Sequence, residues 1–217
     1  ENLAGGNGVT RELAEELLSL GVHCLTSGNH IWDKREIMPV MDVFPQLLRP
    51  ANYPSGQPGK GHHVGKSRTG LKVATLNLSG RVFMNGAIDD PFTIGKKLAE
   101  ELRKETPIIL VDMHAETTSE KAAMGFFMDG LASVVVGTHT HVPTCDHRIL
   151  PKGTAYCTDI GMTGPYDSVI GVEKDINAAP RTDAHMVVAL GADVHVALDI
   201  GAIQHRIALE AFLPQSF

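Results

Sequence analysis

Residues 108–141, IILVDMHAETTSEKAAMGFFMDGLASVVVGTHTH, carry the clearest indication of the fold class of this chain. Residues 108–111 and 134–136 are short, continuous apolar runs, which are typical of buried strands. Residues 119–130 lie between them and predict a helix. Strands that alternate with helices in this way predict an α/β fold.

The same alternation extends towards the start of the chain. Residues 10–20 predict a helix, because Thr10 can cap its first turn and Gly21 follows its end. The other predicted elements are strands at residues 22–26 and 71–78, a helix at residues 93–105, and a loop rich in Pro and Gly at residues 50–61.

Composition narrows the class of protein. The chain has 217 residues, of which 43% are hydrophobic and 20% charged, so we expect a single soluble domain over residues 1–217. The formal net charge is −6 and there is no Lys/Arg-rich run, which disfavours stable binding to nucleic acid. A small phosphate ester remains compatible with this charge, because bound metal ions can supply local positive charge.

The cysteines indicate the compartment. The three cysteines, Cys24, Cys145 and Cys157, are odd in number and form no CxxC pair, so we expect no disulfide framework and a cytoplasmic protein. No apolar stretch is long enough to span a membrane. No secretory signal is visible from Glu1 onwards, although a targeting segment could have preceded that residue.

Polar clusters end or follow the predicted strands. They are Glu1-Asn2, Gly28-Asn29-His30, His114 with Glu116, and His139-Thr140-His141. In open α/β sheets ligands bind at the carboxyl ends of strands. Imidazole suits transition metals, whereas carboxylate and amide oxygens suit harder ions, so this mixed set predicts Mn, Fe or Zn.

The pair His139 and His141 is the sharpest of these signals. Side chains alternate along a strand, so an HxH within a strand would point both rings to one face. An isolated HxH is more often two surface or capping histidines. Similarly, Asn29 could belong to a simple turn after Gly28, and His114 alone would more often be a core histidine. Together the clusters favour a metal site.

Six sequence motifs of this chain resemble those of a known family. They are ENLAGGNG at residues 1–8, SGNHIWDKREI at 27–37, LLRPANYP at 47–54, DMHAETTSEK at 112–121, VVGTHTHVPT at 135–144 and TDIGMTGPYDSVIGVEKD at 158–175. The chain resembles the calcineurin-like metallophosphoesterases, and within them the bacterial YmdB-type cyclic-nucleotide phosphodiesterases. The resemblance is strongest over residues 1–175, and residues 176–217 read as a divergent tail.

The resemblance implies a fold and a ligand set. The fold would be a four-layer double β-sheet sandwich flanked by helices, here lacking the N-terminal strand whose GD motif supplies one metal ligand. Glu1 would bridge two metal ions. The other ligands would be Asn29, His114 and His139 on one ion, and His141 with Asn2 on the other. His30 would act on the substrate, oriented by Asp33.

The resemblance also implies an activity. The chain would be a metal-dependent phosphoric diester hydrolase acting on cyclic nucleotides, with 2′,3′-cyclic AMP as the favoured substrate and a metal-bridging hydroxide as the nucleophile. Iron or manganese would be the metals, with zinc as a further candidate. The partner would be a small phosphodiester, and family members tend to assemble into homo-oligomers. The residues that bind the nucleotide are not indicated.

Two alternatives stay open at this point. The missing GD motif would suit a catalytically impaired regulatory or structural remnant, which should hold fewer than two metal ions per chain. A metallo-β-lactamase-like hydrolase would use HxHxDH, but here Asp146-His147 follows His141 at too long a spacing.

Overall fold

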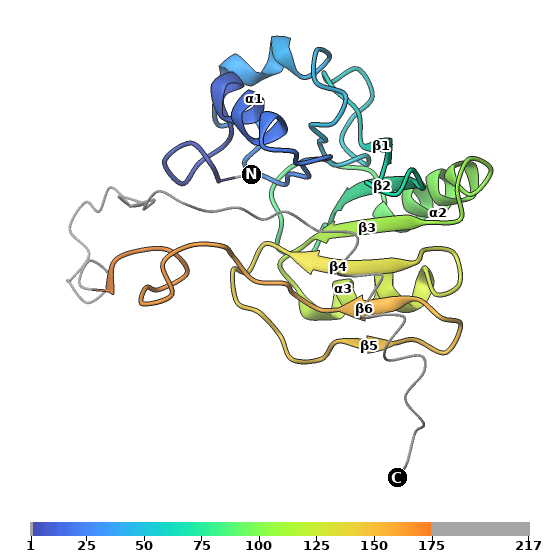
Figure 1. Cartoon of the computed structure of the whole chain (residues 1–217). Coiled ribbons are helices and arrows are strands. Elements are labelled where there is room, and N and C mark those ends of the chain that lie inside the picture. Colours follow the sequence, from blue (N-terminus) through green and yellow to red (C-terminus); the bar gives the residue numbers. More distant parts are fainter. Residues whose placement is uncertain (1, 175–217) are drawn as a thin grey trace.

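A six-stranded sheet with helices packed on it forms the body of the molecule (Figure 1). This computed structural model describes residues 2–174. The helices are α1 (Arg11–Ser19), α2 (Pro91–Leu102), α3 (Thr118–Phe127) and the 3₁₀ helix η1 (Arg35–Val40). The strands are β1 (His62–Lys66), β2 (Lys72–Ser79), β3 (Ile109–His114), β4 (Val134–Thr138), β5 (Arg148–Ile149) and β6 (Ala155–Cys157).

The strand order places several carboxyl ends along one edge of the sheet. The order is β1-β2-β3-β4-β6-β5, in which β2, β3, β4 and β6 are parallel neighbours and β1 and β5 pair antiparallel at the two sides. In Figure 1 the arrowheads of β3 and β4 point to the side where the N-terminal loop lies. Loops that follow these strands can therefore meet the N-terminal segment.

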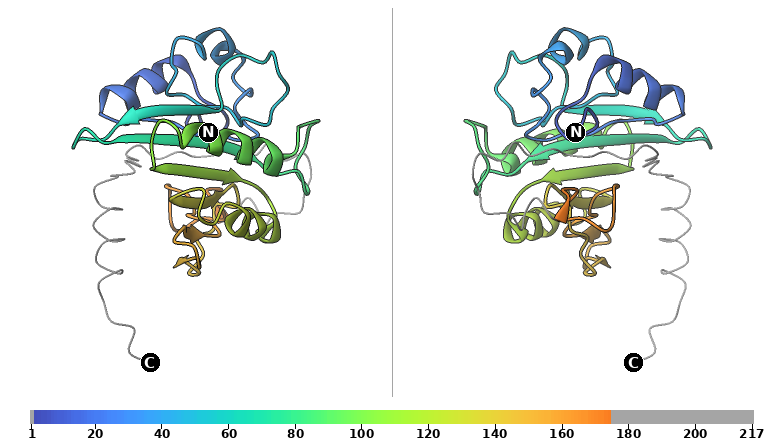
Figure 2. Two further views of the ribbon diagram at one scale, coloured as in Figure 1. Left: turned by 90° about the vertical axis from the view of Figure 1, so that its right-hand side faces the viewer. Right: turned by 90° about the vertical axis from the view of Figure 1, so that its left-hand side faces the viewer.

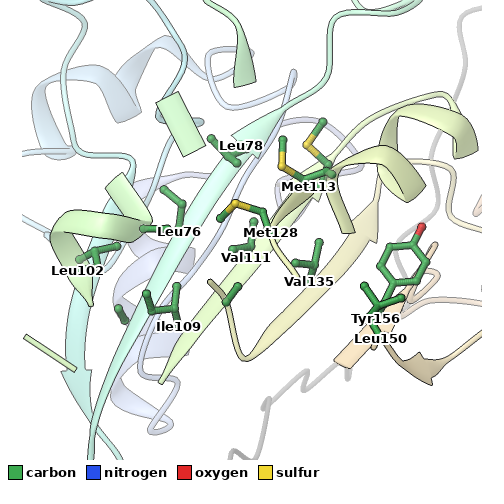
Figure 3. Close-up of a cluster of buried hydrophobic side chains, with 14 of the residues drawn as sticks. Leu76, Leu78, Leu102, Ile109, Val111, Met113, Met128, Val135, Leu150 and Tyr156 are labelled. Carbon is green, nitrogen blue, oxygen red and sulfur yellow. The ribbon is translucent and has the colours of Figure 1, made fainter. Parts of the chain in front are cut away.

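The apolar core fills one face of the sheet (Figure 3). Alternate residues of β2 and β3 point into it, and α2 and α3 cover it with Leu102 of α2 and with Met128, which follows the end of α3. The strand residues in this core include Leu76, Leu78, Ile109, Val111, Met113 and Val135. Burying a Leu, Ile or Met side chain is worth about 1.5–3 kcal/mol each, so this face anchors the helices.

The opposite face carries the polar residues of the same strands. Because side chains alternate, Asn77 of β2 and Asp112 and His114 of β3 point away from the helices. The backbone N–H of Ser27 donates to Asn77 Oδ1 at 3.0 Å, so the segment before the Asn29 loop lies against this face. Burial there raises the pKa of Cys24 to about 12, which keeps its thiol protonated.

A second apolar cluster holds the N-terminal part together. Val9, Ala14, Ile31, Ile37 and their neighbours are buried against one another. Figure 2 shows this N-terminal part, drawn in blue, packed beside the β1–β2 side of the sheet. Because Ile31 is part of this cluster, the cluster holds one end of the loop that carries Asn29 and His30.

Most of the predicted elements are confirmed with small shifts. The helix at 10–20 is α1, whose cap Thr10 accepts from the N–H of Leu13 at 3.4 Å. The helices at 93–105 and 119–130 are α2 and α3, and the strands at 71–78, 108–111 and 134–136 are β2, β3 and β4. The Pro- and Gly-rich stretch at 50–61 has no regular element, as predicted.

The predicted strand at residues 22–26 is wrong. The segment makes one parallel bridge, in which Leu25 donates to Gln46 O and accepts from the N–H of Leu48, both at 2.8 Å. The next rung of this ladder would need an N–H at residue 50, which is Pro50 and has none, and the N–H of Ser27 donates to Asn77 Oδ1. The sequence reading also missed β1, β5 and β6.

The α/β fold class is confirmed, but only one sheet is found. Residues 2–174 contain the six-stranded sheet, and the second sheet of the expected sandwich is not among them. The divergent tail predicted at 176–217 lies outside the described residues. Cys24, Cys145 and Cys157 are all free thiols, as expected. Within residues 2–174, no helix combines the length and apolarity that crossing a membrane requires.

Candidate active site

Two neighbouring parallel strands end at the candidate site. His114 is the last residue of β3, and it pairs in the sheet with Thr138, the last residue of β4. His139 therefore begins the loop directly beside His114. The loop that carries Asn29 reaches the same place from the N-terminal part, so the site combines segments that lie far apart in the chain.

Three side chains converge at one point, around the ring of His114. Its Nε2 lies 2.8 Å from Asn29 Oδ1 and 3.1 Å from His139 Nδ1. His114 is 3% exposed, while Asn29 and His139 are half-buried, so the group opens to solvent on one side. These are the three residues expected to share one metal ion.

A hydrogen-bond chain fixes the tautomer of His114. The hydroxyl of Thr138 donates its single proton to Asp112 Oδ1 at 2.7 Å. Thr138 Oγ1 must then accept from His114 Nδ1, which lies 3.1 Å away. In a neutral ring this leaves a lone pair on His114 Nε2, the atom that faces Asn29 and His139.

Glu116 sets the tautomer of His139 in the same way. Its Oε2 lies 3.0 Å from His139 Nε2, so a neutral ring donates there and keeps its lone pair on Nδ1. A carboxylate on the far nitrogen of an imidazole is a common partner of metal-ligating histidines.

The converging atoms suit a cation. Lone pairs on His114 Nε2, His139 Nδ1 and Asn29 Oδ1 face one another at 2.8 and 3.1 Å, and such acceptors repel unless positive charge lies between them. Two ligand atoms about 2.1 Å from one ion and at right angles to each other lie about 3 Å apart, which matches this spacing. Within residues 2–174, no group of three His, Cys, Asp or Glu side chains could hold a metal ion. The group around His114 contains two such side chains, and its third member is the amide of Asn29.

Asn2 and His141 form a second polar pair. His141 Nδ1 donates to the carbonyl of Ile170 at 2.9 Å, which leaves Nε2 to accept from Asn2 Nδ2 at 3.3 Å. The amide oxygen of this pair, Asn2 Oδ1, is buried and has no hydrogen-bond partner among the described residues. An orphaned amide oxygen beside an imidazole is a donor type that suits a metal ion, so this pair is compatible with the predicted second ligand group.

The backbone at both histidines is strained. His139 has φ 102° and His141 has φ 66°, a region that residues with a side chain rarely occupy. Each such residue costs about 1–3 kcal/mol, and such strain gathers at functional sites. The expectation that both rings share a face of one strand is wrong, because β4 ends at Thr138 and the two rings have different partners.

Residue 28 must be a glycine, because its backbone lies close to the ring of His114. A Cβ at this position would lie 2.1 Å from His114 Nε2, so any side chain would displace the ring. The carbonyl of Gly28 accepts from the hydroxyl of Tyr53 at 3.3 Å, which holds the loop against the sheet. The glycine thus lets Asn29 reach His114.

His30 directly follows Asn29 in the same loop. Its Nδ1 is 2.7 Å from Asp33 Oδ2, the contact that an orienting carboxylate would make. The side chain is 35% exposed, so it can meet a ligand from solvent. Its catalytic role stays a prediction.

The structure therefore brings together most of the predicted site residues. Asn29, His114 and His139 form one group, Asn2 and His141 another, and Glu1 lies outside the described residues. Sequence reasoning missed the roles of Thr138 and Asp112, although both lie within the motifs at 135–144 and 112–121, because their hydrogen bonds form only in the packed structure. Glu116 had a signal, since it lies two residues after His114.

Asp146 does not join the histidines as a metallo-β-lactamase ligand would. Its carboxylate accepts from the hydroxyls of Thr144 and Thr158 and from the N–H of Thr158. These contacts hold the loop before β5 to the end of β6. The structure therefore gives the HxHxDH reading no support.

Comparisons with known proteins agree with this picture. The model of the family described as "YmdB-like protein" matches residues 1–196. The chain is 52% identical over 175 residues, 81% of its length, to the 2′,3′-cyclic-nucleotide 2′-phosphodiesterase of Bacillus subtilis, of which it covers 66%. It spans just under two thirds of the length of the curated relatives that it matches.

Two crystal structures share the fold. One is a hypothetical protein from Thermus thermophilus, with a TM-score of 0.76 and 41% identity, covering 87% of this chain and 74% of that one. The other is a novel phosphatase from Mycoplasma pneumoniae, with a TM-score of 0.76 and 37% identity, covering 87% and 69%.

Proposed function

The chain belongs to the YmdB-like family, and from this premise we propose that it is a metal-dependent phosphodiesterase that hydrolyses cyclic nucleotides, with 2′,3′-cyclic AMP as the favoured substrate. The observation that carries the proposal is the convergence of lone pairs from Asn29, His114 and His139 at the carboxyl edge of the sheet. The name of the Bacillus subtilis relative supports the substrate class.

The chain offers two ligand groups for metal ions. Asn29, His114 and His139 would hold one ion, Asn2 and His141 the other, and Glu1 would bridge them. Iron or manganese would suit this mixed nitrogen and oxygen set, with zinc as a further candidate. When bound, two such ions polarise a phosphoryl group and lower the pKa of water, which supplies a nucleophile at neutral pH.

His30 completes the reaction on the leaving-group side. Hydrolysis adds a water oxygen to phosphorus and breaks one P–O bond of the cyclic diester, and the released ribose oxygen must take up a proton. The imidazolium form of His30 can give this proton, leaving a neutral ring, or its positive charge can stabilise the developing negative charge. Asp33 would orient the ring of His30 through Nδ1, with Nε2 as the atom that acts on the leaving oxygen.

The first test is hydrolysis of bis-(p-nitrophenyl) phosphate with Mn²⁺ and then with excess chelator. We expect turnover that the chelator abolishes and that His114→Ala removes. His147→Ala is the matched control, because this exposed histidine lies outside both ligand groups, and it should behave as the unsubstituted protein. Cyclic nucleotides can then be ranked, with the 2′,3′-cyclic AMP products separated to show which P–O bond breaks.

Folded protein that holds fewer than two metal ions and gives no turnover would overturn the proposal. It would instead favour the regulatory or structural remnant. Metal content is therefore measured on the same preparations. A cytoplasmic location and a homo-oligomer stay predictions.

A further inference from the structure

A buried ion pair lies behind the two histidines. Lys121 Nζ is 2.6 Å from Asp159 Oδ2, and the two side chains are 0% and 1% exposed. Lys121 comes from α3, whereas Asp159 follows the end of β6. Burying two charges is expensive, and a pair of this kind is weak grounds for stability alone, which raises the question of what it does here.

The carboxylate of this pair holds Thr140, the residue between the two histidines. Asp159 Oδ2 accepts from the hydroxyl of Thr140 at 2.8 Å and from its backbone N–H at 3.3 Å. Because the hydroxyl proton goes to Asp159, Thr140 Oγ1 accepts from the N–H of Val142 at 3.4 Å. Both the backbone and the side chain of Thr140 are thus fixed to one buried charge.

Gly137 allows the pair to reach this position. A Cβ on this β4 residue would lie 2.6 Å from Lys121 Cδ and 1.8 Å from the carbonyl oxygen of Thr158. The lysine stem therefore crosses β4 where it has no side chain. Asp159 is further fixed by the N–H of Gly161, which donates to Oδ1 at 2.8 Å.

The strained backbone needs such a support. His139 and His141 have φ 102° and 66°, and conformations of this kind persist only where the surroundings impose them. Thr140, which lies between these two histidines, is tied to the buried charge of Asp159. We propose that the Lys121–Asp159 pair is a positioning device that acts through Thr140 and sets the two imidazoles for metal binding.

Thr140→Val tests this positioning role. The change keeps the side-chain shape, removes the hydroxyl and leaves the ion pair intact, so the protein should fold. We expect the Mn²⁺ affinity measured by calorimetry to fall about tenfold or more, as for other residues behind metal ligands. In the metal-free protein, the ring ¹H–¹⁵N resonances of His139 and His141 should also move.

Two variants serve as controls. Thr140→Ser restores the hydroxyl and should restore both the affinity and the ring resonances. Thr106→Val removes a similar bond, from a buried threonine hydroxyl to Lys72 O at 2.7 Å, at the opposite end of the sheet, and should change neither. Unmoved ring resonances in Thr140→Val would overturn the proposal.

The pair itself is tested by replacing both charges together. Lys121→Met combined with Asp159→Asn avoids leaving one buried charge without a partner. We expect a folded protein with shifted His139 and His141 rings and weaker Mn²⁺ binding. Unchanged rings and affinity in this folded double variant would show that the pair has only a structural role.

The inference rests on the proposed function only for the role of the histidines as metal ligands. If the unsubstituted chain binds no Mn²⁺, the proposed function fails. The ring resonances of the metal-free protein still decide whether Thr140 and the ion pair set the histidines.

Discussion

The ring of His114 is held at both nitrogens, and this decides which of them can serve as a ligand. Thr138 occupies Nδ1, so Nε2 is left for the space shared with Asn29 and His139. The side chains that fix the tautomer are as important to the site as the ligands, because a ring with the opposite tautomer would present an N–H instead of a lone pair.

His30→Ala should separate metal binding from proton transfer. The variant should keep its metal content, because His30 is not one of the ligand residues. Its turnover of 2′,3′-cyclic AMP should fall about 10²–10⁴-fold, the usual worth of a general acid. Its turnover of bis-(p-nitrophenyl) phosphate should fall less, because p-nitrophenolate leaves without protonation.

The two substrates also distinguish the possible roles of His30. Equal losses on both would indicate charge stabilisation instead of proton donation. An unchanged rate on both would contradict any catalytic role. Metal analysis on the same samples shows whether a loss of rate comes from a loss of metal.

Gly28→Ala should damage the site without unfolding the protein. The new Cβ would lie 2.1 Å from His114 Nε2, so the ring must move and Mn²⁺ affinity should fall at least about tenfold. Gly65→Ala is the matched control, since its nearest contact would be 3.5 Å from His63 Nε2. Calorimetric titration of both variants with Mn²⁺ checks this prediction. Equal affinities would show that the loop can move to accept the new Cβ without weakening metal binding.

At the level of the elements, the N-terminal cap of α2 helps to hold the strands that carry the site. α2 connects β2 to β3, and it begins at Pro91 with Asp90 as its cap. Asp90 accepts from the hydroxyl and the N–H of Thr93, at 2.5 and 2.9 Å. The bond from the Thr93 hydroxyl is the main cause that lowers the pKa of the Asp90 carboxyl.

Removing this cap should lower stability in a pH-dependent way. Asp90→Ala should reduce the free energy of unfolding by about 1 kcal/mol at pH 7. Since the folded pKa lies below the ordinary value near 3.8, the charged cap stabilises the protein above about pH 4, and this contribution is lost as the pH falls further.

Asp90→Asn separates the charge from the cap. Asparagine caps helices about as well, so this variant should stay close to the unsubstituted protein at pH 7 and lose the pH dependence that the carboxylate contributes. Denaturant unfolding at pH 7 and below pH 4 checks both variants. Equal stability of Asp90→Ala and the unsubstituted protein at pH 7 would contradict the prediction.

At the level of the whole molecule, the site depends on docking one part of the chain on another. Asn29 and His30 belong to the N-terminal part, His114 and His139 to the sheet, and Ile170, which orients His141, to a later loop. A metal ion bound between these parts would stabilise the folded state only. Ligand binding of this kind adds free energy to folding that grows with its affinity.

Mn²⁺ should therefore raise the unfolding midpoint of the chain. At a concentration a hundred times the Kd, the gain is about 2.7 kcal/mol, and excess chelator should reverse it. His114→Ala should lose most of this gain, whereas His147→Ala should keep it. Thermal unfolding with and without Mn²⁺ measures both, and a midpoint that Mn²⁺ leaves unmoved would contradict metal binding across these parts.

The fold class, six of the elements and the residues of the polar clusters could all be predicted from the amino-acid sequence. Apolar runs and helical spacing are local patterns, so β2, β3 and β4 and the three α-helices could be predicted from them. Residues 22–26 show the limit of this reasoning, because strand formation depends on a partner segment, and the one at residues 44–48 offers a single bridge.

How the polar clusters meet could not be predicted in this way, because it depends on packing between distant segments. The contact between Asn29 and His114 spans 85 positions, and the left-handed backbone of His139 and His141 depends on its surroundings. The roles of Thr138 and Asp159 were hidden for the same reason, since a hydrogen-bond chain exists only once distant segments have packed. Local sequence sets which groups are available, whereas their distances and protonation follow from packing between elements far apart in the chain.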